Sequence, residues 1–224
     1  MKENAEELVV SFENSISSDI CDTAGDLAEI GLDAVMDDGI LKDIPILSTV
    51  VGLYRIGHTI RERHTIKQLA LFVAELNKGC ADDRRRKHLL EKLNSDTRKN
   101  KQEIEYILVL LDSYLEYEKP QILAKLYIAY LEKTITWTEF AKYAAALDRI
   151  FPTDVEMLKE HDFKKKAIMC KQSESEGILR LISAGFMYEQ TASYYMGEDA
   201  SEITDYETAY SITAFGQKFI DIVG

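Results

Sequence analysis

The sequence predicts a mainly α-helical protein with one small β-hairpin near its C-terminus. Proline and glycine are scarce, at three and eleven of 224 residues, so few positions break helices. Apolar residues recur at spacings of three and four along most of the chain, which is the period of an amphipathic helix. A polar, tyrosine-rich tract after Glu189 is the exception, because its residue types favour strands. A hydrophobic content of 46% with 29% charged residues is typical of a globular protein.

The first expected helix covers residues 15–38, after an acidic start with a short apolar patch. Its apolar stripe runs up to an Asp-Asp-Gly sequence that ends it. Pro45 suits the first turn of the next helix, because its φ is already near the helical value and no N–H is needed there. This second helix is expected to span residues 46–77. Gly52 and Gly57 within it indicate either close packing by a neighbour or a kink.

Shorter helices are expected to follow, each with its own start or stop signal. Asp82 and Asp83 are good N-caps for a short basic helix. The next helix starts near residue 95, and its apolar stripe consists of Ile104, Ile107, Leu108, Leu111 and Leu115. Thr136 and Glu139 form a capping box for another helix. Short connections predict an antiparallel bundle. The expected core of this bundle includes Leu108, Leu111, Leu126 and Phe140.

Pro152 is the expected boundary between a helical domain, residues 1–151, and a C-terminal module, residues 152–224. In this module an apolar-periodic helix ends at Gly185, a tyrosine-rich hairpin follows, and a Thr-x-x-Gly-x-x-Phe sequence opens a closing helix. This order resembles the end of a winged-helix domain, with its recognition helix, wing and last helix. The resemblance implies an antiparallel helical domain packed on a winged-helix-like module.

Charge distinguishes this module from most winged helices, which bind DNA. Residues 172–224 carry a net charge of −7, and the expected recognition helix offers one basic residue, Arg180, beside Glu174 and Glu176. Phosphate binding needs lysine and arginine, so we expect the module only to pack or to bind protein, and not to bind duplex DNA. The wing-region candidates for contact with a partner are Tyr188, Tyr194, Tyr195 and Tyr206. Tyrosine is common at interfaces, but it also suits plain cross-strand pairs in a hairpin.

One basic block lies between the acidic ends of the chain. Residues 1–50 have a net charge of −10 and residues 51–101 a net charge of +7. The candidates for binding an anion or a partner in this block are Arg61, Arg63, Lys67, Arg84, Arg85, Arg86 and Lys87. They could contact nucleic acid or an anionic head group. Alternatively, they form a solvated face or pair with the acidic residues 1–50.

Motifs for catalysis or metal binding are missing from the sequence. It has no P-loop, no Gly-x-Ser-x-Gly elbow and no dinucleotide-binding glycine pattern, and its histidines and cysteines lack metal-ligand spacing. We therefore expect neither an enzyme nor a bound metal or cofactor. Three widely spaced cysteines and the lack of a secretion signal favour a cytoplasmic protein. The apolar residues 44–57 are too few to span a bilayer, so a core helix is expected there.

The middle of the chain resembles uncharacterised helical proteins of bacteria and prophages, some of which are loosely grouped with abortive-infection proteins. The shared features are an Ile-Pro turn, a glycine-containing apolar helix, Arg-x-Arg and a Trp-x-x-Phe helix. The resemblance implies a bacterial or prophage setting, with phage defence or counter-defence as a role. We therefore expect a non-catalytic protein that binds or regulates another protein or a second copy of itself. The alternatives are nucleic-acid binding through residues 55–101 and a membrane-active effector that uses residues 44–57.

Overall fold

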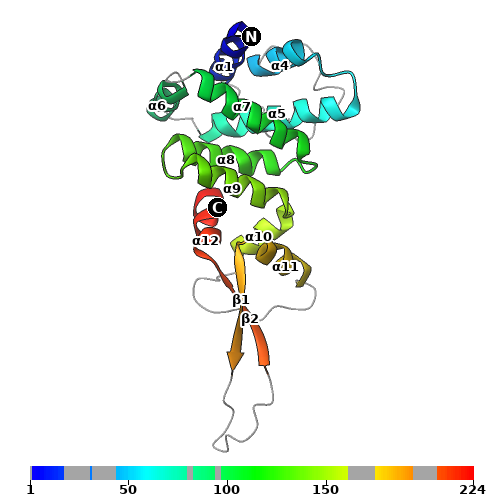
Figure 1. Ribbon diagram of the computed structural model, residues 1–224, viewed down its shortest axis with the longest axis vertical. Coiled ribbons are helices and arrows are strands. Elements are labelled where there is room, and N and C mark those ends of the chain that lie inside the picture. Colours follow the sequence, from blue (N-terminus) through cyan, green and yellow to red (C-terminus); the bar gives the residue numbers. More distant parts are fainter. Residues whose placement is uncertain are drawn as a thin grey trace, which may run out of the picture. The chain divides into compact units, whose positions relative to one another are not determined.

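The computed structural model describes residues 2–17, 31, 44–79, 83–93, 97–160, 175–193 and 206–224. These residues form ten helices and one two-stranded antiparallel sheet (Figure 1). The prediction of a mainly α-helical fold with one small hairpin is confirmed. The chain divides into two compact units, Met1–Phe140 and Ala141–Gly224.

The first unit is helical throughout its described part. Its helices are α1 (Lys2–Ser17), α4 (Pro45–Tyr54), α5 (Ile60–Gly79), α6 (Asp83–Leu93), α7 (Thr97–Ser113) and α8 (Lys119–Leu131). The first residues of α9 (Trp137–Asp148) also belong to it. Helix α5 packs against α7 and α8, and α1 packs against α4 and α7 (Figure 1).

An aromatic cluster occupies the centre of this unit. The ring of Tyr127 lies 6.2 Å from Phe12, 6.1 Å from Phe72 and 5.8 Å from Phe140, measured between ring centroids. All four side chains are fully buried. The predicted core residues Leu111 and Leu126 are buried as well, and the predicted core residue Phe140 is one of these four.

Two residues of the predicted α7 stripe lie outside the core. Helix α7 ends at Ser113, so Leu115 lies in the following loop, where its side chain is 79% exposed. Leu108 is only half-buried, because it lines a pocket. The prediction that Leu108 belongs to the core is therefore wrong. The spacing of apolar residues identifies a helix face, but it does not tell which positions on that face a neighbouring helix covers.

The N-terminal helix lies earlier than predicted. Helix α1 covers Lys2–Ser17, whereas the sequence favoured a helix over residues 15–38, most of which lie outside the described residues. Leu8, Phe12 and Ile16 recur every four residues and are at most 1% exposed. They form the apolar face with which α1 packs on its neighbours. Acidic residues around this stripe made the segment look like a polar start to the chain.

The predicted single helix over residues 46–77 is wrong, since α4 and α5 are separate helices. Arg55 ends α4 in the left-handed region, with φ at 53°, and Gly57 has φ at 114°. Helix α5 then begins with a capping box: the backbone N–H of Glu62 donates to Thr59 Oγ1, and Glu62 Oε2 accepts from the backbone N–H of Thr59. Gly57 therefore lies at a break between two helices.

The second unit contains the rest of α9, a pair of short helices, the hairpin and a closing helix. These are α10 (Pro152–Glu160), α11 (Ser175–Ser183), β1 (Met187–Ser193), β2 (Tyr206–Ile212) and α12 (Ala214–Val223). The strands are antiparallel, from Met187 opposite Ile212 to Ser193 opposite Tyr206. Gly185, with φ at 86°, lies between α11 and β1. The predicted succession of helix, hairpin and closing helix is thus present.

The closing helix is held by a cap and by aromatic contacts. Thr213 Oγ1 accepts from the backbone N–H of Gly216 at 2.9 Å, which caps the start of α12. The ring of Phe186 lies 5.3 Å from Phe215 and 4.6 Å from Phe219. A Cβ atom at Gly216 would collide with the backbone carbonyl of Phe186, so α12 approaches the start of β1 closely only because this residue is glycine.

The division between the two units falls inside α9, whereas the expected boundary was Pro152. Pro152 begins a helix, as predicted. Asp154 accepts a hydrogen bond from the backbone N–H of Phe151 at 2.9 Å and two from the Arg180 guanidinium of α11, each at 2.8 Å. These bonds join α10 and the residue before it to α11.

Candidate functional site

A pocket of about 460 Å³ opens among α4, α5 and α7 in the first unit. Aliphatic side chains form much of its wall, namely Val50, Ile56, Leu108 and Val109. The other lining residues are Tyr54, Thr65, Glu62, Glu105 and Asp112. The lining therefore combines apolar surface with three carboxylates, and none of its described residues is a lysine, arginine or histidine.

The start of α5 fixes the carboxylate of Glu62. Its Oε2 atom accepts backbone N–H bonds from Gly57, His58 and Thr59, at 3.1, 2.9 and 2.9 Å. These bonds lower the pKa of Glu62, and the bond from Thr59 is the largest cause. The loop between α4 and α5 is thus folded around a carboxylate that is ionised at neutral pH.

Side chains of α5 hold Asp112 of α7. Arg61 Nη2 donates to Asp112 Oδ2 at 2.7 Å, and Thr65 Oγ1 donates to Asp112 Oδ1 at 2.7 Å. The hydrogen bond from Arg61 is the main reason that the pKa of Asp112 is lowered, while burial opposes it. This network joins α5 to α7 at the edge of the pocket.

Glu105 has looser contacts than the other two carboxylates. Tyr54 Oη donates to its Oε1 atom at 3.4 Å, and Lys101 Nζ lies 3.5 Å from the same atom. Both distances are long for hydrogen bonds. Burial, followed by the negative charge of Glu105, raises the pKa of Tyr54, so the phenol stays protonated and remains a donor. Glu105 therefore keeps the capacity to accept from a bound group.

Two of the residues that line the pocket are exposed and apolar or aromatic. Val109 is 70% exposed and Tyr54 is 47% exposed. Ile60, two residues before the lining residue Glu62, is 76% exposed, and Leu115, three residues after the lining residue Asp112, is 79% exposed. Single exposed apolar residues are ordinary, whereas exposed apolar side chains on the wall of a concavity indicate a binding site.

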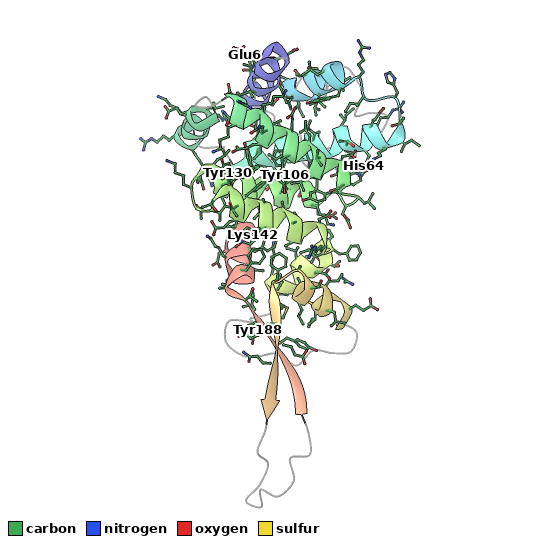
Figure 2. The ribbon with its side chains drawn as sticks, in the orientation of Figure 1. Glu6, His64, Tyr106, Tyr130, Lys142 and Tyr188 are labelled. Atoms are coloured by element: carbon green, nitrogen blue, oxygen red, sulfur yellow. The ribbon has the colours of Figure 1, made fainter. Side chains whose placement is uncertain are left out.

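The loop after α7 is attached to α5. His64 Nε2 lies 2.9 Å from the carbonyl oxygen of Tyr114, and Gln68 Nε2 donates to the same oxygen at 3.0 Å (Figure 2 labels His64). The rings of His64 and Tyr117 lie 5.2 Å apart. These contacts hold the loop that follows α7, in which Leu115 lies, on α5.

The structure places the three basic candidates of α5 in different settings. Arg61 is bound to the α7 carboxylate described above, and Arg63 Nε donates to the carbonyl oxygen of Gly57 at 3.1 Å. Lys67 is only 3% exposed, its ammonium lies 4.1 Å from the centre of the Tyr117 ring, and burial lowers its pKa. Lys67 is therefore an interior residue, which corrects the prediction that it is available to bind an anion or a partner.

The basic residues of α6 lie apart from those at the start of α5. Helix α5 has 20 residues, which at ~1.5 Å per residue is about 30 Å, and α6 follows its far end (Figure 1). Arg84, Arg85 and Lys87 are exposed and Arg86 is half-buried. Arg85 forms an ion pair with Glu132 at the end of α8. The basic block of the sequence is therefore divided into separate groups on the folded unit.

Ion pairs of this block extend to the segment that follows it. Arg61, Arg85, Lys99 and Lys101 pair with Asp112, Glu132, Glu103 and Glu105, respectively. The alternative expectation was pairing with residues 1–50. Most acidic residues of that range lie outside the described residues.

The hairpin tyrosines are described in part. Tyr188 on β1 is 43% exposed, and Gln190 Nε2 donates to its hydroxyl at 2.8 Å (Figure 2). Tyr206 begins β2. Tyr194 and Tyr195 lie outside the described residues. A partner contact through these tyrosines stays a prediction.

Two further sequence expectations concern metals and membranes. Among the described residues, no group of three or more His, Cys, Asp or Glu side chains is arranged to hold a metal ion. None of the helices in the described ranges is long and apolar enough to cross a membrane. Within residues 44–57, the side chains of Ile46, Leu47 and Val50 are buried in the first unit.

Most residues of the pocket were not predicted from the sequence as site residues. These include Tyr54, Glu62, Glu105 and Val109. A local signal did exist, since Thr-x-x-Glu directly after Gly57 and His58 is a capping box that predicts a new helix start. The meeting of α4, α5 and α7 has no such signal, because it depends on packing between segments that are far apart in the sequence.

No protein-family model, curated protein or solved structure matches this chain. The winged-helix relationship of the C-terminal module therefore stays a prediction, as does the resemblance to bacterial and prophage proteins.

Proposed function

We propose that this chain acts by binding another protein at the pocket formed by α4, α5 and α7. The observation that carries the proposal is the exposure of Val109 and Tyr54, at 70% and 47%, on the wall of a 460 Å³ concavity. Binding sites are typically concave, with apolar walls and a few convergent polar groups. Ile60 and Leu115, close in sequence to the lining residues Glu62 and Asp112, are exposed apolar side chains as well, and such surface suits a macromolecule better than a small ligand.

Site-specific photo-crosslinking in the full chain tests this proposal. A photoreactive amino acid replaces Val109 in one version and Val10 in the other, and each version is irradiated in a lysate of the organism that encodes the chain. Val10 is a matched control, since it is also a valine, is 47% exposed on α1 and does not line the pocket. We expect a discrete protein adduct from position 109 only. An excess of the natural chain without the photoreactive amino acid should abolish this adduct by competition, whereas an excess of the V109R chain should leave it unchanged.

The competition step distinguishes a specific partner from abundant proteins that are crosslinked nonspecifically. Identical adducts from positions 109 and 10 would mean that the pocket has no particular partner. The absence of any adduct at position 109 that the unlabelled chain competes for would contradict the proposal.

Exposed Arg84, Arg85 and Lys87 favour a second candidate function, which is binding of a nucleic acid by α6. Such binding should weaken as salt increases, because phosphate contacts release counterions. Fluorescence anisotropy with single-stranded RNA would measure it for the natural chain and for the double variant R84E/K87E. A signal that survives the double variant or is insensitive to salt would refute a role for α6. The acidic residues 172–224 are not expected to contribute.

A further inference from the structure

The lining of the α4–α5–α7 pocket is acidic and incompletely neutralised. Asp112 is matched by Arg61, with which it forms an ion pair at 2.7 Å. Glu62 is held by three backbone N–H groups, which carry no net charge. Among the described residues, Glu105 is loosely paired with Lys101 at 3.5 Å and accepts from Tyr54 Oη at 3.4 Å. Glu62 and this loosely paired Glu105, from different helices, therefore leave negative charge facing the same concavity.

Apolar surface lies next to this charge. Leu108 and Val109 line the pocket together with Glu62 and Glu105. A lysine or arginine side chain has a matching construction, because its aliphatic stem packs on apolar surface while its charged head reaches polar groups. A neighbouring apolar side chain would cover the exposed part of Val109.

We infer that the occupant of the pocket is a segment of a partner protein that carries a lysine or arginine beside an apolar side chain. This inference rests on the proposed function and specifies the chemistry of the partner. The cationic head binds between Glu62 and Glu105, and the apolar side chain packs on Leu108 and Val109.

Two physical arguments favour a cationic segment over an uncharged or acidic one. An uncharged segment would bury Glu62 without a counter-charge and Glu105 with the loosely paired Lys101, and removing carboxylates from water in that way is costly. An acidic segment would be repelled by the pocket and by a chain whose net charge is −12. A cationic segment is attracted by both.

Selection of peptides displayed on phage, with the immobilised full chain as target, tests the inference. The probes are random peptides about twelve residues long, and the binders are then synthesised and titrated against variants. E62Q/E105Q removes both charges, and glutamine at position 62 can still complete the capping box of α5. E91Q/E156Q is the matched control, because it removes the same charge at two exposed positions outside the pocket.

The binders should place lysine or arginine next to leucine, isoleucine or phenylalanine. Their affinity should fall about tenfold on E62Q/E105Q, as expected for the loss of two partly exposed ion pairs. It should stay within about twofold on E91Q/E156Q and be lost on V109R. If E62Q/E105Q melts at a clearly lower temperature, E105Q alone replaces it, since Glu105 has no part in the cap, and about threefold weaker binding is expected.

Three results would overturn the inference. Peptides that need Val109 but lack basic residues, or that bind E62Q/E105Q unchanged, would overturn the cationic partner and leave the proposed function intact. Equal weakening on the control variant would mean general attraction to an acidic chain. If the binding of no selected peptide depends on Val109, the inference is wrong. If, in addition, no specific crosslink forms at position 109, the proposed function is wrong as well.

Discussion

Replacing Leu111 and Leu115 by alanine should change stability by very different amounts. Both leucines belong to one apolar stripe in the sequence, but Leu111 is fully buried in α7 and Leu115 is 79% exposed after its end. L111A removes buried methylene-sized groups, at about 0.8 kcal/mol each, and leaves a cavity. The free energy of unfolding should therefore fall by about 2–5 kcal/mol. For L115A, the change should be below about 0.5 kcal/mol.

Urea unfolding followed by tryptophan fluorescence measures this difference. The single tryptophan, Trp137, lies in the first unit, 4.9 Å from Phe140 and 5.3 Å from Tyr130 between ring centroids. Its emission therefore reports on the core that contains Leu111. With an m-value of about 2 kcal/mol/M, the midpoint should fall by about 1–2.5 M for L111A and by less than about 0.3 M for L115A.

Similar midpoint shifts for the two variants would refute this reasoning. A large effect of L115A would mean that the Leu115 side chain is covered and not exposed. A negligible effect of L111A would mean that Leu111 is not buried in the core of the first unit.

Glycine substitutions and acid titration provide three further tests. Gly216→Ala should destabilise the second unit, because the added Cβ collides with the Phe186 carbonyl. Hydrogen exchange of the α12 backbone amides should therefore become faster. Unchanged exchange rates would contradict the close contact at Gly216. Gly52→Ala, in the interior of α4, should instead raise the free energy of unfolding by up to ~1 kcal/mol, since no described neighbour lies within 4 Å of the new Cβ. Urea titration measures this change, and a lower free energy of unfolding would contradict the prediction. Asp112 has a lowered pKa in the folded chain, so its stabilising effect is complete above the usual value of 3.8 and is lost as pH falls through the lowered one. Urea midpoints between pH 7 and 3 should therefore fall less steeply for D112N, and parallel curves would count against the Arg61–Asp112 pair.

The sequence by itself determined the fold class and many local boundaries, because these depend on residues close together in the chain. Thr136 and Glu139 form the predicted capping box, with the backbone N–H of Thr136 donating to the Glu139 carboxylate at 2.7 Å. Pro45 begins α4, Gly79 ends α5 and Thr213 caps the closing helix. Side-chain and backbone groups a few residues apart make these bonds, so their spacing can be read before the chain is folded.

Only the tertiary structure decided which residues of those helices are accessible and what they meet. Lys67 and Arg61 belong to the same basic stretch, but one is buried against the Tyr117 ring and the other pairs with Asp112. The pocket forms because α4 ends at Arg55 before α5 begins, and because Asp112 of α7 is hydrogen-bonded to Arg61 of α5. Contacts of this kind join residues about fifty positions apart, and packing selects them from many arrangements that the same helical periodicity would permit.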